Sequence, residues 1–350
     1  MREIDITYRT MLAELGQRSL DAAFQADFPL TGRFVSVPVK GRDYWYFDEP
    51  TGEGDKRRYV GPAADPEISA RVEAHKEIKD DLRARRSLVG TLLRSGGMNG
   101  PDRFAGDVIE ALANGGFFRL RGVLIGTAAF GCYAGLVGVR LPNTALQTGD
   151  ADFAQDFAIS GEVGDSLPPV LDLLKSLDAS FRPIPHQSDK TRVAAFANRS
   201  GYRVEFLTGN RGSDDYTGQP SPMPALGGAS AVNLRYLDFL IRDPVRTVLL
   251  HRAGVSVLVP SPERYAVHKL IVASQRLSGE DGRLKRDKDA LQASLLCEGL
   301  VETRRGDELA DAYEEAMARG PSWREAIQEG RAMMTDKGNA ALWEAVGKRL

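Results

Sequence analysis

The sequence predicts an α+β fold whose core is a mixed β-sheet with flanking helices. Short segments rich in β-branched and aromatic residues crowd the middle of the chain, as strands do. Segments between them, and the whole of 261–350, repeat apolar residues at helical spacing. We therefore expect a small N-terminal helix and β-hairpin module over 1–98, the mixed-sheet core over 99–260 and an α-helical C-terminal domain over 261–350.

The N-terminal module begins with apolar residues spaced for one amphipathic helix over 3–25. Residues 33–61 alternate around a glycine turn and predict an aromatic β-hairpin, and 66–94 predict a long charged helix. The hairpin carries an aromatic and basic group made up of Tyr44, Trp45, Tyr46, Lys56, Arg57 and Arg58. Such a group can stack bases and pair phosphates, or the aromatics can simply cover a small sheet. Both interpretations remain open.

The core is expected to alternate helices and strands. We predict helices over 101–114, 165–177 and 233–241, and strands over 117–125, 181–184, 192–198 and 202–207. A loop rich in Gly, Pro and Ser covers 209–230, and a final hairpin joins 245–250 to 255–259. In the last part, Ser261-Pro262 opens a helix with a serine cap and a proline in the first turn. Further helices are expected over 284–296, 307–318, 322–334 and 337–349.

Composition limits the class of protein. The chain has 350 residues, 42% of them apolar, and a formal net charge of −2, which argues against a protein that coats nucleic acid non-specifically. Its two cysteines lie far apart and show no zinc-ligand spacing. The charged N-terminus has no apolar signal core, and no apolar run reaches the length of a membrane span. We expect a cytoplasmic protein without a membrane partner.

The stretch 121–153 holds the strongest chemical signal. An apolar run ends at Gly126-Thr127, and the stretch closes on Asp150 and Asp152. Carboxylates two residues apart on a strand project to the same face, where they can share a divalent cation such as Mg²⁺. Glu205 lies between apolar residues of a later strand, so we expect it to be buried and either paired or metal-bound.

Structural explanations for the same residues remain open. An Asp-x-Asp pair is often a solvated strand edge, and the Gly131, Gly135 and Gly138 series favours close helix packing over phosphate binding.

The order of these elements resembles the active-site signature of the polymerase-β-like nucleotidyltransferase superfamily. The resemblance implies that Gly126 and Thr127 lead into a helix and touch nucleotide phosphates. It also implies that Asp150, Asp152 and Glu205 bind Mg²⁺ or Mn²⁺, with Glu205 helping to deprotonate the acceptor.

Further motifs lie in the helical tail. His268-Lys269-Leu270 with Arg276, and then Arg286-Asp287-Lys288-Asp289, resemble the downstream motifs of AbiEii-type nucleotidyltransferases, which include toxins of toxin–antitoxin pairs. AbiEii-type chains often carry an Asp three residues after the Lys-Asp pair, where this chain has Gln292. The full arrangement is similar to a bacterial nucleotidyltransferase-like family.

The resemblance implies transfer of a nucleoside monophosphate from an NTP to an acceptor hydroxyl, with release of pyrophosphate. The acceptor could be RNA or tRNA, a protein or a small molecule, and an antitoxin partner is possible. The implied catalytic residues are Asp150, Asp152, Glu205, Lys269 and Asp289, with nucleotide contacts from Gly126, Thr127, Lys269 and Lys288. The alternatives are a catalytically weak nucleotide-binding or toxin–antitoxin-type interaction protein, and a purely structural protein.

Overall fold

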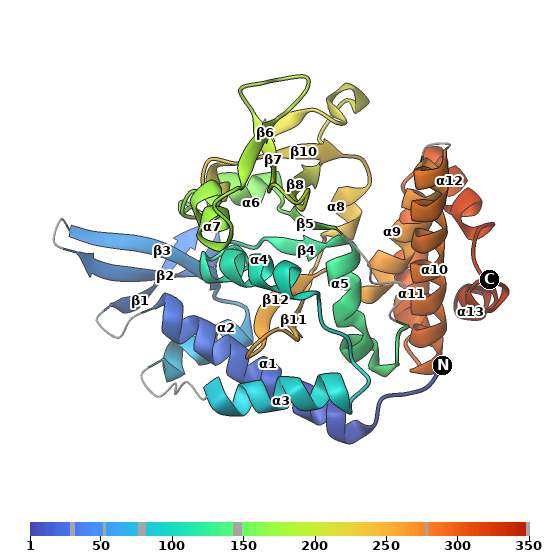
Figure 1. Ribbon diagram of the computed structural model, residues 1–350, viewed down its shortest axis with the longest axis horizontal. Coiled ribbons are helices and arrows are strands. Elements are labelled where there is room, and N and C mark those ends of the chain that lie inside the picture. The colour runs from blue at the N-terminus through green and yellow to red at the C-terminus, as the bar shows by residue number, and fades with distance from the viewer. Residues whose placement is uncertain (29–31, 52–53, 76–81, 143–148, 277–278, 348–350) are drawn as a thin grey trace.

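The computed structural model describes residues 1–28, 32–51, 54–75, 82–142, 149–276 and 279–347, and shows three groups of strands among many helices (Figure 1). The expected α+β class with a mixed sheet is confirmed. A three-stranded sheet lies at one end of the molecule, the central sheet in the middle, and the C-terminal helices at the other end.

The central sheet has seven strands and both parallel and antiparallel pairs. They are β4 (Val123–Ile125), β5 (Asp150–Ala154), β6 (Arg182–Pro185), β7 (Val193–Ala197), β8 (Arg203–Gly209), β9 (Pro220–Pro222) and β10 (Ser230–Leu234). Five strands pair in the order β4-β5-β8-β10-β9. β7 pairs with the first residues of β8, and β6 pairs with β7. β5 is antiparallel to β4 but parallel to β8, so the two kinds of pairing meet at β5.

Four predictions for this region were wrong in detail. The loop expected over 209–230 contains β9, which pairs with β10. The strand expected over 117–125 is only three residues long, because 117–122 form turns in which Arg121 takes a left-handed φ of 63°. The helix expected from 165 begins at Val170. The helix expected over 233–241 is instead the end of β10 followed by the four-residue α8 (Leu237–Leu240), because β10 pairs in parallel with β8.

The helices of the central part pack around this sheet. They are α4 (Arg103–Asn114), α5 (Gly126–Tyr133), α6 (Phe157–Glu162) and α7 (Val170–Leu177). A π-helical turn, Ala134–Gly138, extends α5, and short 3-10 turns occur at Asp214–Tyr216 and Pro224–Leu226. The expected final hairpin is present as β11 (Val245–Leu249) and β12 (Val255–Val259).

The N-terminal part contains more sheet than expected. α1 (Ile6–Asp27) precedes β1 (Arg33–Val39), β2 (Arg42–Thr51) and β3 (Gly54–Pro62), which form a three-stranded antiparallel sheet where a hairpin was predicted. The predicted long helix is described as α2 (Pro66–Ala74) and α3 (Leu82–Arg94), and residues 76–81 lie outside the described residues.

The C-terminal part is helical, as predicted. Its helices are α9 (Pro262–Gln275), α10 (Glu280–Glu302), α11 (Gly306–Ala318), α12 (Pro321–Arg331) and α13 (Asp336–Val346). Ser261 is the N-cap residue of α9 and Pro262 is its first residue, as predicted, but the Ser261 side chain makes no capping hydrogen bond.

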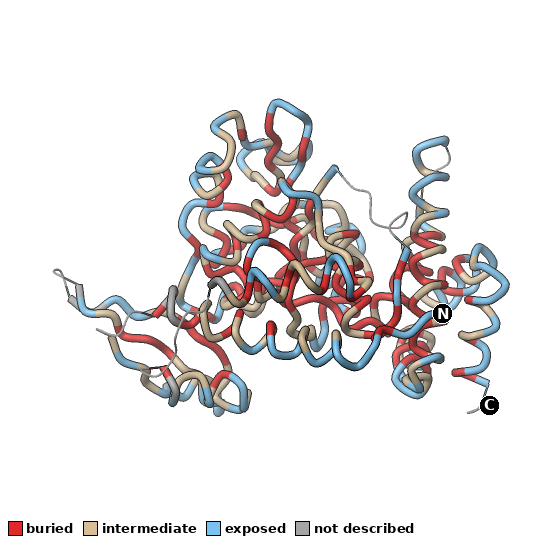
Figure 2. The backbone as a smooth tube through the Cα atoms, turned by 60° about the horizontal axis from the view of Figure 1, so that its bottom comes forward, coloured by how far each residue is buried: buried red, intermediate tan, exposed pale blue. Residues whose placement is uncertain are grey.

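Buried residues form one large cluster that runs through all three parts of the chain, from Ile4 to Val346 (Figure 2). A smaller cluster joins α1 to the N-terminal sheet through Phe24, Phe28 and Phe47. Gly135 packs closely against α1, as one interpretation of the glycine series predicted, since a Cβ there would meet Leu12 Cδ2 at 2.2 Å. Among the described helices, none combines the length and apolarity that a membrane span requires.

Candidate active site

Three adjacent strands place the Gly-Thr turn and two of the carboxylates side by side. Asp152 on β5 stands opposite Ile125, the last residue of β4, and opposite Glu205 on β8. Neighbouring strands lie about 4.8 Å apart, so these positions are direct lateral neighbours. Asp150 is two residues before Asp152 and therefore projects to the same face of β5.

Gly126 follows β4 directly and is held against Asp152. Its φ is 66°, a left-handed value, and a Cβ built on it would lie 2.6 Å from Asp152 Oδ2. Only glycine fits this position without strain or a clash. Gly126 also begins α5, whose first backbone N–H groups have no partner within the helix and suit an anion. The adjacent Thr127 is 9% exposed.

The carboxylates repel one another in a partly buried setting. Burial first, and then the charges of Asp150 and Glu205, raise the pKa of Asp152 to about 7, although Lys269 and Arg276 oppose the shift. Glu205 is only half-buried, with 33% of its side chain exposed, and pairs with Arg203 Nη2 at 2.6 Å. The expectation that Glu205 is buried was therefore wrong. Val204 and Phe206, its apolar neighbours, point to the opposite, buried face.

Two helices of the C-terminal part contribute a charged triad. Asp289 of α10 is 1% exposed, and its two oxygens accept from Lys269 Nζ at 2.5 Å and from Arg276 Nε at 2.8 Å. Burial would raise the pKa of Asp289, but Lys269 and Arg276 hold it below its usual value. Both carboxylate oxygens are therefore occupied by cations of this chain.

The triad lies near the carboxylates of the sheet. The charges of Lys269 and Arg276 both act on Asp152, and the charge of Asp150 acts on Lys288. Burial, and then Lys269, lower the pKa of the Lys288 ammonium. The structure thus gathers the residues predicted from the two halves of the chain: Gly126, Thr127, Asp150, Asp152, Glu205, Lys269, Lys288 and Asp289.

The residue Gln292, which departs from the AbiEii-type pattern, has a structural partner. The Tyr265 hydroxyl of α9 lies 2.9 Å from the carbonyl oxygen of Gly126 and 3.1 Å from Gln292 Oε1. Tyr265 is 1% exposed and Gln292 is fully buried. Through the Tyr265 hydroxyl, α9 and α10 both contact the Gly-Thr turn. Sequence reasoning missed this role, because neither residue type signals chemistry unless its partner is known.

The donor set suits a hard divalent cation. Asp150, Asp152 and Glu205 supply the oxygen ligands that Mg²⁺ and Mn²⁺ prefer, and a cation would relieve the repulsion that raises the pKa of Asp152. Their oxygens are not all within 4.8 Å of one another. Within the described residues, the one group of three possible ligands that meets this distance is Asp107, Glu110 and His251.

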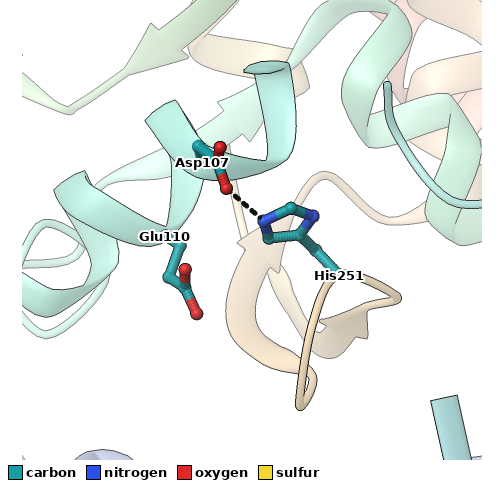
Figure 3. Close-up of side chains that lie close together, drawn as sticks. All are labelled: Asp107, Glu110 and His251. Atoms are coloured by element: carbon teal, nitrogen blue, oxygen red, sulfur yellow. Dashed lines mark hydrogen bonds and ion pairs between the residues drawn. The ribbon is translucent and has the colours of Figure 1, made fainter. Parts of the chain in front are cut away.

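That second group forms an ion-pair cluster between α4 and the turn of the β11–β12 hairpin (Figure 3). His251 Nε2 lies 2.8 Å from Asp107 Oδ1, which also pairs with Arg252 Nη2 at 2.6 Å. Arg252 Nε reaches Glu110 at 3.3 Å. Because a guanidinium already neutralises both carboxylates, the cluster is best explained as a contact that fastens the hairpin to α4. Sequence reasoning did not identify it.

Comparison with known proteins adds one positive finding. A family model described as "Nucleotidyltransferase" matches residues 103–318, more than half of the chain. The matched region includes every residue of the candidate site and extends from α4 to the end of α11. No curated protein and no solved structure matches the chain.

Proposed function

The chain belongs to this nucleotidyltransferase family, and on that premise we propose that it transfers a nucleoside monophosphate from an NTP to an acceptor hydroxyl. The observation that carries the proposal is the register of the sheet. It sets Asp152 between Gly126 and Glu205, with Asp150 on the same face.

The three carboxylates have the chemistry of a divalent-metal site. Asp150, Asp152 and Glu205 would hold Mg²⁺ or Mn²⁺, which when bound neutralises charge on the phosphates and on the entering and leaving oxygens. Arg203 must release Glu205 for that carboxylate to become available, because the two are paired at 2.6 Å.

The start of α5 is suited to binding the triphosphate. Gly126 brings backbone close to Asp152, and the N–H groups that follow can donate to phosphate oxygens. The Thr127 side chain adds a hydroxyl donor. A side chain at position 126 would fill this space, because a Cβ there already meets Asp152 Oδ2.

In the transfer step, one bond to phosphorus forms, one breaks, and one proton moves to a residue of this chain. The acceptor oxygen forms a bond to the α-phosphorus, the bond from that phosphorus to the bridging oxygen breaks, and pyrophosphate leaves. The proton of the acceptor hydroxyl passes to a carboxylate oxygen of Glu205, whose side chain is one-third exposed.

Cations of α9 and α10 stabilise the negative charge of the triphosphate. Lys269, Arg276 and Lys288 lie within electrostatic reach of Asp150 or Asp152. Asp289 is buried and both its oxygens are occupied. We therefore assign it the positioning of Lys269 and Arg276 in place of the catalytic role that the resemblance implies.

Labelling identifies the acceptor and tests the reaction together. The protein is incubated with each α-labelled NTP in turn, with Mg²⁺ or Mn²⁺, and with total RNA, total protein or a small-molecule extract. We expect label in one of these fractions, and none in excess EDTA or with Asp150→Asn. NTP binding without transfer of label to any fraction would favour the alternative of a catalytically weak nucleotide-binding or toxin–antitoxin-type protein.

A further inference from the structure

A cavity lies between the N-terminal sheet and α6, away from the carboxylates. Its volume is about 730 Å³, and its lining includes Tyr44, Tyr46, Tyr59 and Arg121. A cavity of this size falls within the range of small-molecule sites, which is about 300–1,000 Å³. None of the residues assigned to nucleotidyl transfer lines it.

Three tyrosines form one wall of this cavity. Tyr46 and Tyr59 meet edge to face with centroids 5.7 Å apart, and Tyr44 lies 6.0 Å from Tyr59. Strand alternation turns Trp45 to the other side, where it donates to Ser69 Oγ. Among the basic residues of β3, Arg57 pairs with Asp48, and its guanidinium carbon lies 6.0 Å from the centroid of the Tyr46 ring.

The tyrosine hydroxyls are available to a ligand. Tyr46 is 9% exposed and Tyr59 is 3% exposed, yet neither hydroxyl has a hydrogen-bond partner among the residues that the structure describes. Burial raises the pKa of both phenols, so they stay protonated and can donate. Neither hydroxyl is among the buried side-chain atoms that lack a partner, so both are accessible from the cavity, where they can donate to a bound ligand.

Arg121 provides a positive charge at the same place. It is half-buried, and its guanidinium makes no ion pair or hydrogen bond within the described part of the chain. Its charge acts on the Tyr59 phenol and lowers the pKa that burial raises. Arg121 also holds a left-handed φ of 63°, a strained conformation for a residue with a Cβ.

Two further groups complete the chemistry of the cavity. Arg42, which is exposed, adds a second guanidinium to the lining of the cavity, and Asp43 adds a carboxylate. Glu162, which also lines the cavity, is paired with Lys40. The cavity therefore offers aromatic faces, hydroxyl donors, a carboxylate for sugar hydroxyls, and guanidinium groups for phosphate.

We propose that this cavity binds a nucleotide unit, with its base on the tyrosine wall and its phosphate at Arg121. The unit is either a free mononucleotide or one residue of a single-stranded nucleic acid, because both present the same base and phosphate. Arg121 precedes β4 and Gly126 follows it, so the cavity is on the order of 15 Å from the carboxylate site. Binding here is independent of the proposed transfer reaction.

Equilibrium binding tests the proposal. The full-length protein is titrated, in EDTA to suppress metal-dependent binding elsewhere, with nucleoside monophosphates by calorimetry and with a labelled single-stranded RNA hexamer by anisotropy. Arg121→Gly removes the guanidinium and relieves the left-handed strain, so the fold should tolerate it. We expect Arg121→Gly and Tyr44→Ala each to weaken binding about tenfold or more, and Tyr44→Phe to retain most of it.

Matched controls exist elsewhere in the chain. Arg304 is exposed and also has a left-handed φ, of 61°, so Arg304→Gly makes the same chemical change far from the cavity. Tyr216 is 58% exposed on a 3-10 turn, and Tyr216→Ala matches Tyr44→Ala. Both controls should bind like the wild type.

Binding of the monophosphate alone identifies a free nucleotide as the ligand, and tighter binding of the hexamer identifies a nucleic acid strand. The proposal is overturned if the wild type binds neither probe. It is also overturned if folded Arg121→Gly and Tyr44→Ala bind as tightly as their controls.

Discussion

At the scale of single residues, Gly126 has little freedom to vary. Its backbone is left-handed and its Cα faces the Asp152 carboxylate, so two independent constraints exclude a side chain. A glycine in a sequence indicates such a constraint only in general terms. The carboxylate that imposes this one lies on a different strand, and only the register of β4 and β5 reveals it.

Gly126→Ala should lower both stability and NTP affinity. The left-handed backbone alone costs a residue with a Cβ about 1–3 kcal/mol, and the methyl group must also displace Asp152. Gly161→Ala is the control, because a Cβ there meets nothing within 4 Å and α6 favours alanine. Chemical denaturation and NTP titration would compare the two, and equal NTP affinity in both folded variants would limit Gly126 to a structural role.

His268 should make stability depend on pH. Burial, and then Lys269, lower its pKa to about 3, against 6.5 in the unfolded chain. The unfolded state therefore binds more protons below pH 6.5, and stability is lost as pH falls from 6.5 towards 3. Denaturant unfolding of the wild type and His268→Leu at pH 7 and pH 4.5 tests this. Between pH 7 and pH 4.5, the free energy of unfolding should fall further for the wild type than for the variant. Equal losses in the two proteins would show that His268 is not held in its neutral form by burial.

At the scale of elements, α9 and α10 meet at Asp289. Asp289→Asn leaves Lys269 without its counter-charge in a buried site, which typically costs about 3–5 kcal/mol. The double variant Lys269→Met, Asp289→Leu should recover much of that stability but not turnover. Thermal unfolding and transfer rates of both variants test this, and full turnover in the double variant would remove the triad from the site.

Much of the element pattern could be predicted from sequence, because it depends on local periodicity. β7, β8 and the five C-terminal helices were found in this way. The errors arise where the structure of a segment depends on residues that are far from it in the sequence. Residues 230–234 became a strand because β8 offers a parallel edge, and Glu205 is half-exposed because only one face of β8 is buried. Gln292 needed Tyr265 beside it before its role was visible.

At the scale of the whole molecule, the N-terminal part is joined to the core. Ile4 N donates to the carbonyl oxygen of Gly138 at 2.8 Å, Leu15 is fully buried, and both belong to the main hydrophobic cluster. The division into domains at 98 and 260 remains a prediction. We expect a chain lacking residues 1–98 to lose cooperative thermal unfolding, because apolar surface on β11 and β12 becomes exposed. A sharp melting transition near that of the full chain would show instead that the core folds alone.

The central claim is that carboxylates on adjacent strands perform nucleotidyl transfer, and the initial rate of pyrophosphate release tests it most directly. The rate is measured for wild type, Asp152→Asn and Asp156→Asn with NTPs, Mg²⁺ and the acceptor fraction that labelling identifies. Asp156 lies four residues further along and caps α6, where asparagine also serves. We expect a loss of about a hundredfold or more for Asp152→Asn and a near wild-type rate for Asp156→Asn. Equal rates for all three folded proteins would contradict it.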